Sequence, residues 1–143
     1  MKLVIDANEL FAGVIIKGRG RQSKTLDILF SDEVELFAPF RLLAEMENNR
    51  SEIRKKSGFC MDDFESFVEV IKLRIKFIPL EEVTDEIPDA KKICPDPKDL
   101  EYFALALKLK CSIWSEEKLL KEQSKIKVFT TYELKEVIKQ NKK

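Results

Sequence analysis

The sequence predicts an α/β fold: a three-layer α/β/α sandwich around a central, mainly parallel sheet of four to five strands. Short apolar runs alternate along the chain with longer segments of helical periodicity, which is typical of parallel strands joined by crossover helices. The 143 residues, 44% of them hydrophobic, are sufficient for one compact core. Because no linker or repeat divides the chain, we expect a single domain over residues 1–135 and a frayed tail over residues 136–143.

The first half of the chain contains two predicted strands separated by helical segments. Residues 2–5 are a short apolar run, as expected for a buried strand. Ser23 is a suitable N-cap for one helix, and Pro39 stands at the start of another. The basic, glycine-containing residues 17–21 are expected to form a loop. The strands are 2–5 and 33–38, and the helices are 9–16, 23–30, 40–56 and a segment that begins at 62 or 63.

The second half continues the same alternation. Asp96 and Pro97 form a helix start, an N-cap residue followed by the preferred first helical residue. Thr130 and Glu133 have the spacing of a capping box for the last helix. Residues 81–92 are acidic and match neither pattern clearly. The strands expected here are 76–79, 111–114 and 127–129.

The absence of histidine restricts the chemistry of the protein. The chain has no histidine, which excludes Ser-His-Asp and Cys-His catalysis and histidine-based acid–base ribonucleases. Cys60, Cys94 and Cys111 form no C-x-x-C pair and are expected to be small, partly buried apolar residues in a reducing compartment. An enzyme with this composition must therefore depend on carboxylates, lysines, cofactors or metals.

Charge and hydropathy restrict the partners. Acidic and basic residues balance at 26 each, so nucleic-acid binding would need a local basic patch. Lys17, Arg19, Arg21 and Lys24 form such a run without an intervening acid, and they are either phosphate-binding residues or a solvated loop. No apolar run approaches the ~20 residues that span a bilayer. We expect a cytoplasmic protein without a membrane partner.

Several acids fall near the expected ends of strands. Asp6 directly follows the first strand, and Glu116 and Glu117 follow the strand at 111–114. Ligands of open parallel sheets bind beyond these carboxyl ends. Asp96 and Asp99 lie in the first turn of the helix that leads into the later strand, and spacing alone does not say whether they reach the same place.

Glu45 is a further acid, and it lies among apolar residues of a predicted helix. A carboxylate in such surroundings needs a partner, and a divalent cation such as Mg²⁺ or Mn²⁺ would provide one. A metal held by carboxylates can activate water for phosphodiester hydrolysis without histidine. Each acid also has a structural explanation, as a helix cap, a strand end, a solvated helix start or a polar helix edge.

Five segments, in order along the chain, resemble the segments of a PIN domain. In sequence they are V-I-D-A-N, L-A-E-M, D-P-K-D-L-E-Y-F-A-L-A, C-S-I-W-S-E-E-K-L-L and V-F-T-T-Y-E-L. They occupy residues 4–8, 43–46, 96–106, 111–120 and 128–134. The third is the closest match, because Ala104 and Ala106 follow Asp99 at five and seven positions. Because each motif is short, the order and spacing of all five carry the resemblance.

The resemblance implies a metal-dependent ribonuclease with bound Mg²⁺ or Mn²⁺. Its implied catalytic acids are Asp6, Glu45, Asp99 and Glu117. Of these, Asp6, Asp99 and Glu117 are the implied metal ligands. The supporting residues are Asn8, Ser115, Asp96 and Glu116. Glu117 departs from the family, which usually has aspartate there, so Glu116 is an alternative for this position.

The resemblance also implies partners. PIN domains of this size are frequently homodimers, and many are VapC-type toxins of toxin–antitoxin pairs, for which RNA is the substrate and an antitoxin is the protein partner. The alternative is a catalytically weak or inactive PIN-like module that binds RNA or protein, which Glu117 and the zero net charge favour. A P-loop is excluded because Arg19 and Gly20 stand where its Lys and Ser/Thr are needed.

Overall fold

The computed structural model describes residues 1–20 and 24–141. Within this part, five parallel strands form one sheet in the order β3-β2-β1-β4-β5. The strands are β1 (Lys2–Ile5), β2 (Glu35–Pro39), β3 (Ile75–Ile78), β4 (Ser112–Trp114) and β5 (Val128–Phe129). The α/β class and the parallel sheet expected from the sequence are therefore confirmed.

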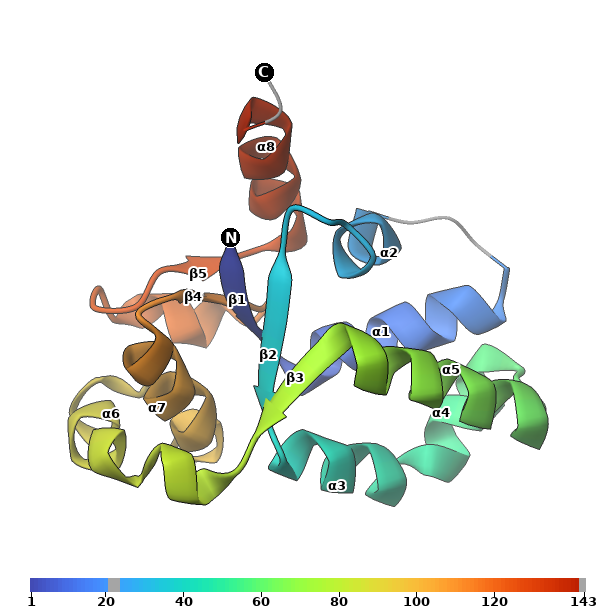
Figure 1. The fold of residues 1–143 in the computed structure, drawn as a ribbon, viewed down its shortest axis with the longest axis horizontal. Helices are drawn as coiled ribbons and strands as arrows, with labels where there is room; N and C mark the ends of the chain where they lie inside the picture. Colours follow the sequence, from blue (N-terminus) through green and yellow to red (C-terminus); the bar gives the residue numbers. More distant parts are fainter. Residues whose placement is uncertain (21–23, 142–143) are drawn as a thin grey trace.

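Helices cover both faces of the sheet. The α-helices in the described residues are α1 (Ala7–Gly18), α2 (Lys24–Leu29), α3 (Arg41–Asn48), α4 (Arg50–Ser57), α5 (Met61–Arg74), α6 (Ile87–Ile93), α7 (Leu100–Leu109) and α8 (Thr131–Asn141). Short 3₁₀ turns are η1 (Leu80–Glu82), η2 (Thr84–Glu86), η3 (Pro97–Asp99) and η4 (Lys118–Glu122). Figure 1 shows α6 and α7 on one side of the sheet and α1, α2 and α5 on the other. None of the helices described is long and apolar enough to cross a membrane.

The structure differs from the sequence prediction at three places. Helix α1 continues through Gly18, where a loop was expected, and the N–H of Arg19 still donates to the Ile15 carbonyl at 3.2 Å. The helix expected over 40–56 divides at Asn49, whose backbone N–H and side-chain amide both donate to the Glu45 carbonyl, at 3.0 and 2.7 Å. Helix α8 extends beyond residue 135, where we expected the ordered domain to end. Ser23, the expected cap of the second helix, lies outside the described residues.

The centre of the core lies where α7 packs on the sheet. Residues 3–5 of β1 are fully buried between the two helical layers. Helix α7 is buried on most of its surface, and its Ala104 and Ala106 have no exposed surface at all. Alanines at this contact allow a helix to approach the strands closely.

The direction of α7 positions the functional residues. The helix leads into β4 and packs on β1, β2 and β4, so it runs antiparallel to the strands. Its N-terminus consequently lies at the carboxyl edge of the sheet, the edge at which the residues after β1 and β4 also lie. Topology thus answers what spacing left open for Asp96 and Asp99.

Helix α1 is held against α4 by a close contact at Gly18. A Cβ atom on Gly18 would lie 2.5 Å from Cβ and 2.6 Å from the carbonyl oxygen of Ser57, a buried residue. Real Cβ atoms essentially never approach other atoms so closely, so the two helices would have to move apart. At Gly13, by contrast, an added Cβ would meet only side-chain carbons at 3.6 Å or more.

We predict that Gly18→Ala destabilises the protein by about 1–3 kcal/mol, the usual cost of overpacking. Gly13→Ala is the matched control in the same helix, and it should be neutral or stabilising by up to about 1 kcal/mol because alanine favours helix. Urea unfolding of both variants measures the difference. Equal stability of the two variants would contradict the close α1–α4 contact.

Candidate active site

A polar pocket of about 320 Å³ lies beyond the carboxyl ends of β1 and β4. It brings together side chains from the start of α1, from α3, from η3 and α7, and from the loop after β4. The lining residues are Asp6, Ala7, Asn8, Arg41, Glu45, Asp96, Lys98, Asp99, Tyr102 and Glu117. The four acids that the family resemblance implied to be catalytic therefore line one pocket.

Asp6 is fixed by two hydrogen bonds. Its Oδ1 accepts from the backbone N–H of Asn8 at 3.3 Å, which makes Asp6 the N-cap of α1. Its Oδ2 accepts from the Ser115 hydroxyl at 2.7 Å. The same hydroxyl oxygen accepts from the N–H of Glu117 at 3.0 Å. Ser115, which is fully buried, thus joins the residue after β1 to the loop after β4.

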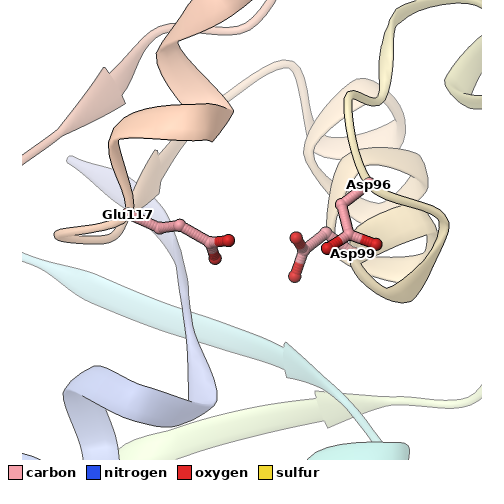
Figure 2. A group of neighbouring side chains, drawn as sticks. All are labelled: Asp96, Asp99 and Glu117. Carbon is pink, nitrogen blue, oxygen red and sulfur yellow. The ribbon is translucent and has the colours of Figure 1, made fainter.

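Three acids form a group that could hold a metal ion. One carboxylate oxygen from each of Asp96, Asp99 and Glu117 lies within 4.8 Å of the other two. Figure 2 shows the Glu117 side chain extended from the loop after β4 toward the two aspartates, which come from the start of η3 and α7. Asp6 lies outside this group but lines the same pocket. Asp96, which the resemblance implied as a supporting residue and not as a metal ligand, is thus a candidate ligand beside Asp99.

Asp96 and Asp99 are held in place by the turn between them. The side chain of Asp96 accepts from the backbone N–H of Lys98 at 3.0 Å, so Asp96 caps η3 as its spacing predicted. The N–H of Asp99 donates to the Asp96 carbonyl at 2.9 Å. A capping carboxylate still has free lone pairs, so its structural role does not prevent it from binding an ion.

Glu45 faces the pocket from α3 and has a partner in the chain. Arg41, one turn earlier, places its Nε 3.1 Å from Glu45 Oε1. Burial raises the pKa of Glu45, Arg41 lowers it, and the charge of Asp6 raises it. The pairing agrees with the alternative that Glu45 lies on a polar helix edge, and it leaves the carboxylate within the pocket.

The crowding of acids disfavours their charged forms. Burial, followed by repulsion from Glu117 and then Asp6, raises the pKa of Asp99 to about 6. Burial also raises the pKa of Glu117, with Asp6 as the largest charge that adds to the effect. A cation bound among these groups would reverse this penalty, because it favours the ionised carboxylates.

The donor set fits a hard divalent cation. Every candidate ligand is a carboxylate oxygen, which suits Mg²⁺ and Mn²⁺ and does not suit zinc in a Cys/His site. Tyr102 lines the same pocket, and its buried hydroxyl has no hydrogen-bond partner among the described residues. A buried, unpaired hydroxyl is unfavourable by itself, and a bound ligand or metal-bound water would satisfy it.

Sequence reasoning overlooked a second acidic cluster beside the pocket. Glu9, on the buried side of α1, is only 4% exposed. Burial, then repulsion from Glu116 and Asp6, raises its pKa to about 7. Thr131 Oγ1 donates to Glu9 at 3.4 Å, and the N–H of Thr131 donates to Glu116 at 2.7 Å. The available signal was an acid beside Leu10 on the apolar face of α1.

This cluster distinguishes Glu116 from Glu117. The two are adjacent in sequence, yet Glu117 faces Asp99 in the pocket while Glu116 faces the start of α8. Glu117 rather than Glu116 therefore occupies the position after β4 in the pocket.

The predicted substrate-binding residues lie away from the pocket. Lys17 and Arg19 are at the far end of α1, about 15 Å from Asn8 at the ordinary helical rise. Arg19 Nε donates to the Lys56 carbonyl at 2.7 Å, and Lys24 Nζ lies 5.2 Å from the centre of the Tyr132 ring. Arg21 lies outside the described residues. The cations that do line the pocket, Arg41 and Lys98, were not predicted.

We predict that Glu117→Gln lowers the pKa of Asp99, because it removes the largest charge that raises that pKa. Glu116→Gln should instead lower the pKa of Glu9, for which Glu116 is the largest such charge. Carbon-detected NMR titration of the carboxyl groups in metal-free protein checks both. Each variant is the control for the other: a shift of Asp99 in Glu116→Gln as large as in Glu117→Gln, or of Glu9 in Glu117→Gln as large as in Glu116→Gln, would contradict the division into two clusters.

We predict that Glu9→Gln stabilises the protein increasingly as the pH rises from about 5 to about 8. Folding raises the pKa of Glu9 from about 4.5 to about 7, so the folded state binds more protons here and the wild type loses stability as the pH rises through this window. The gain should reach the order of 1–3 kcal/mol at the upper end. Urea unfolding at both pH values measures it, with Glu136→Gln on the exposed side of α8 as the control. A gain that does not change with pH would disprove the assignment.

Comparisons with known proteins identify the family and a similar fold. The model of the PIN domain family matches residues 4–140. A solved structure of VapBC2 from Rickettsia felis, bound to a DNA fragment from its promoter, is similar with a TM-score of 0.59 and 14% identity. The similarity covers 91% of this chain and 98% of the other. No curated protein sequence matches. The match over nearly the whole length shows that the chain belongs to the PIN domain family.

Proposed function

We propose that the protein is a metal-dependent endoribonuclease. The observation that carries the proposal is the convergence of Asp96, Asp99 and Glu117 within 4.8 Å, in a pocket that Asp6 and Glu45 also line. This arrangement provides hard oxygen ligands in a protein without histidine. Membership of the PIN family, whose domains are typically nucleases, supports the same reaction class.

The side chains would divide the work as follows. Asp99 and Glu117, with Asp96 or Asp6, would hold Mg²⁺ or Mn²⁺. When bound, such an ion lowers the pKa of a coordinated water and offsets the charge on the attacked phosphate. Ser115 orients Asp6 and the backbone of Glu117 through its hydrogen bonds. Asn8 lines the pocket beside Asp6 and supplies the N–H that fixes it.

The remaining acid, Glu45, is suited to receiving a proton. Burial raises its pKa, so its carboxylate is more basic than an exposed one. In this proposal Glu45 accepts the proton of the attacking water, and Arg41 limits how far the pKa of Glu45 rises.

We also propose that RNA is the substrate and that a protein partner regulates the enzyme. A similar fold occurs in the solved VapBC2 structure. The resemblance to VapC-type PIN domains implies a toxin whose protein partner is an antitoxin. An antitoxin-like partner and a homodimer are therefore the assemblies to test first, by co-purification and by light scattering.

A second candidate function is a non-catalytic RNA- or protein-binding module. Glu117, one methylene longer than the usual aspartate, and the pairing of Glu45 with Arg41 favour it. The first feature would change the geometry in which the acids hold a metal, and the second would reduce the freedom of Glu45 to accept a proton.

We predict that purified protein cleaves a mixed RNA pool with Mn²⁺ or Mg²⁺ and not with EDTA. Asp99→Asn should reduce the rate by more than about 100-fold, since even outer-sphere partners of a metal contribute about 10–100-fold. Sequencing of the product ends would define the cleavage site.

The matched control is Asp89→Asn, which removes an exposed acid of α6 that pairs with Lys92 at 3.7 Å. It should cleave at the wild-type rate. Mn²⁺ binding followed by electron paramagnetic resonance separates the two candidate functions: an enzyme binds the ion and loses it in Asp99→Asn. A protein that binds RNA without binding Mn²⁺ or cutting would support the binding module.

A further inference from the structure

The pocket contains a strong negative charge that any RNA phosphate must approach. Five carboxylates line it, from Asp6, Glu45, Asp96, Asp99 and Glu117. One divalent cation would not neutralise them all, and a phosphodiester adds another negative charge. An approaching phosphate therefore requires positive groups of the chain itself at the pocket.

Arg41 is the arginine that lines this pocket. It is the first residue of α3, follows the end of β2, and has a side chain that is 41% exposed. Two acids from different elements hold its guanidinium. Nε lies 3.1 Å from Glu45 of the same helix, and Nη1 lies 3.9 Å from Glu101 of α7.

The contacts leave one edge of the guanidinium available. The Nε side faces Glu45, whereas the distance from Nη1 to Glu101 exceeds hydrogen-bond length. In the described part of the chain, neither terminal nitrogen donates a hydrogen bond. An arginine held along one edge and open along the other can donate to phosphate oxygens with little loss of side-chain freedom.

We propose that Arg41 binds a phosphate of the RNA substrate at the rim of the acidic pocket. This inference rests on the proposed function and assigns to it a residue that binds substrate. The guanidinium retains Glu45 on its Nε side and donates its terminal N–H groups to the non-bridging phosphate oxygens. Arg41 thereby holds the phosphate next to the carboxylates and offsets part of its charge.

The competing explanation is an ordinary helix-surface ion pair, since Arg41 and Glu45 have the i, i+4 spacing. The two explanations differ in what depends on Arg41. A surface pair would change thermal stability slightly and leave RNA affinity and its salt dependence unchanged. A phosphate contact would change the RNA affinity and its salt dependence, with little effect on folding.

The test measures binding of a fluorescein-labelled, mixed-sequence single-stranded RNA in Mg²⁺ buffer. Asp99→Asn serves as the parent so that the probe is not cut. Adding Arg41→Gln should raise the Kd about 10-fold, the usual effect of a hydrogen bond to a charged group. It should also reduce the slope of log affinity against log salt by about 0.7, the value for one phosphate on a single strand. Arg41→Lys should fall between the two, because it keeps the charge and loses the fork.

The control is Lys72→Gln, which removes a cation of α5 that pairs with Glu69 at 3.4 Å, outside the acidic pocket. It should bind as the parent does. An Arg41→Gln variant that binds like the control, or a parent that binds no RNA, would overturn the inference. If the unsubstituted chain cleaves RNA but RNA binding does not depend on Arg41, this inference is wrong and the proposed nuclease function is retained. If RNA binding depends on Arg41 but no metal-dependent cleavage occurs, the phosphate contact of Arg41 is supported and the proposed nuclease function is wrong.

Discussion

The buried hydroxyl of Ser115 is the interaction on which the pocket depends. It donates to Asp6, which is 109 positions away in sequence, and accepts from the N–H of Glu117. Both partners follow neighbouring parallel strands, so the β1–β4 pairing brings them together and the hydroxyl sets their orientation. The hydrogen bonds are in the interior, where a hydroxyl without partners would be unfavourable, so the arrangement is well determined.

Burial and repulsion then explain the electrostatics. Parallel strands and the start of α7 bring acids to one edge of the sheet, and the pKa of Asp99 rises to about 6 as a result. The fold thus holds carboxyl groups whose charged forms are disfavoured, and groups with such shifted pKa values are common at functional sites. A structural site would more commonly be apolar or contain matched ion pairs, whereas here Arg41 and Lys98 are outnumbered by the acids of the pocket.

Glu116 and Glu117 are adjacent in sequence, yet the backbone directs their side chains to different places. Glu116 and Glu117 point to different clusters, one at the start of α8 and one in the pocket. Glu9 joins the first cluster and is buried enough for burial to dominate its pKa. Among the described residues, the pocket acids Asp96, Asp99 and Glu117 form the group that could hold a metal ion.

The sequence by itself determined the α/β class, a mainly parallel sheet and most helix starts, because periodicity, capping residues and proline act locally. The capping box of Thr130 and Glu133, for example, forms as its spacing predicted. The resemblance to PIN domains, carried by short motifs in order, also identified Asp6, Glu45, Asp99 and Glu117, which the structure places in one pocket. Helix limits near Gly18 and Asn49 were predicted wrongly: α1 continues to Gly18, which packs closely on Ser57, and the expected helix over 40–56 divides at Asn49.

Only the tertiary structure decided which charged groups meet. Glu9 lies in a buried cluster, Glu116 lies outside the pocket, and Arg41 lines the pocket. By residue type alone, each could equally have been a solvated surface residue. The basic residues Lys17 and Arg19, which sequence suggested for RNA binding, lie at the other end of α1. The electrostatic environment of a side chain depends on its distances to groups on segments far apart in the chain, and local sequence patterns do not determine which of these segments meet.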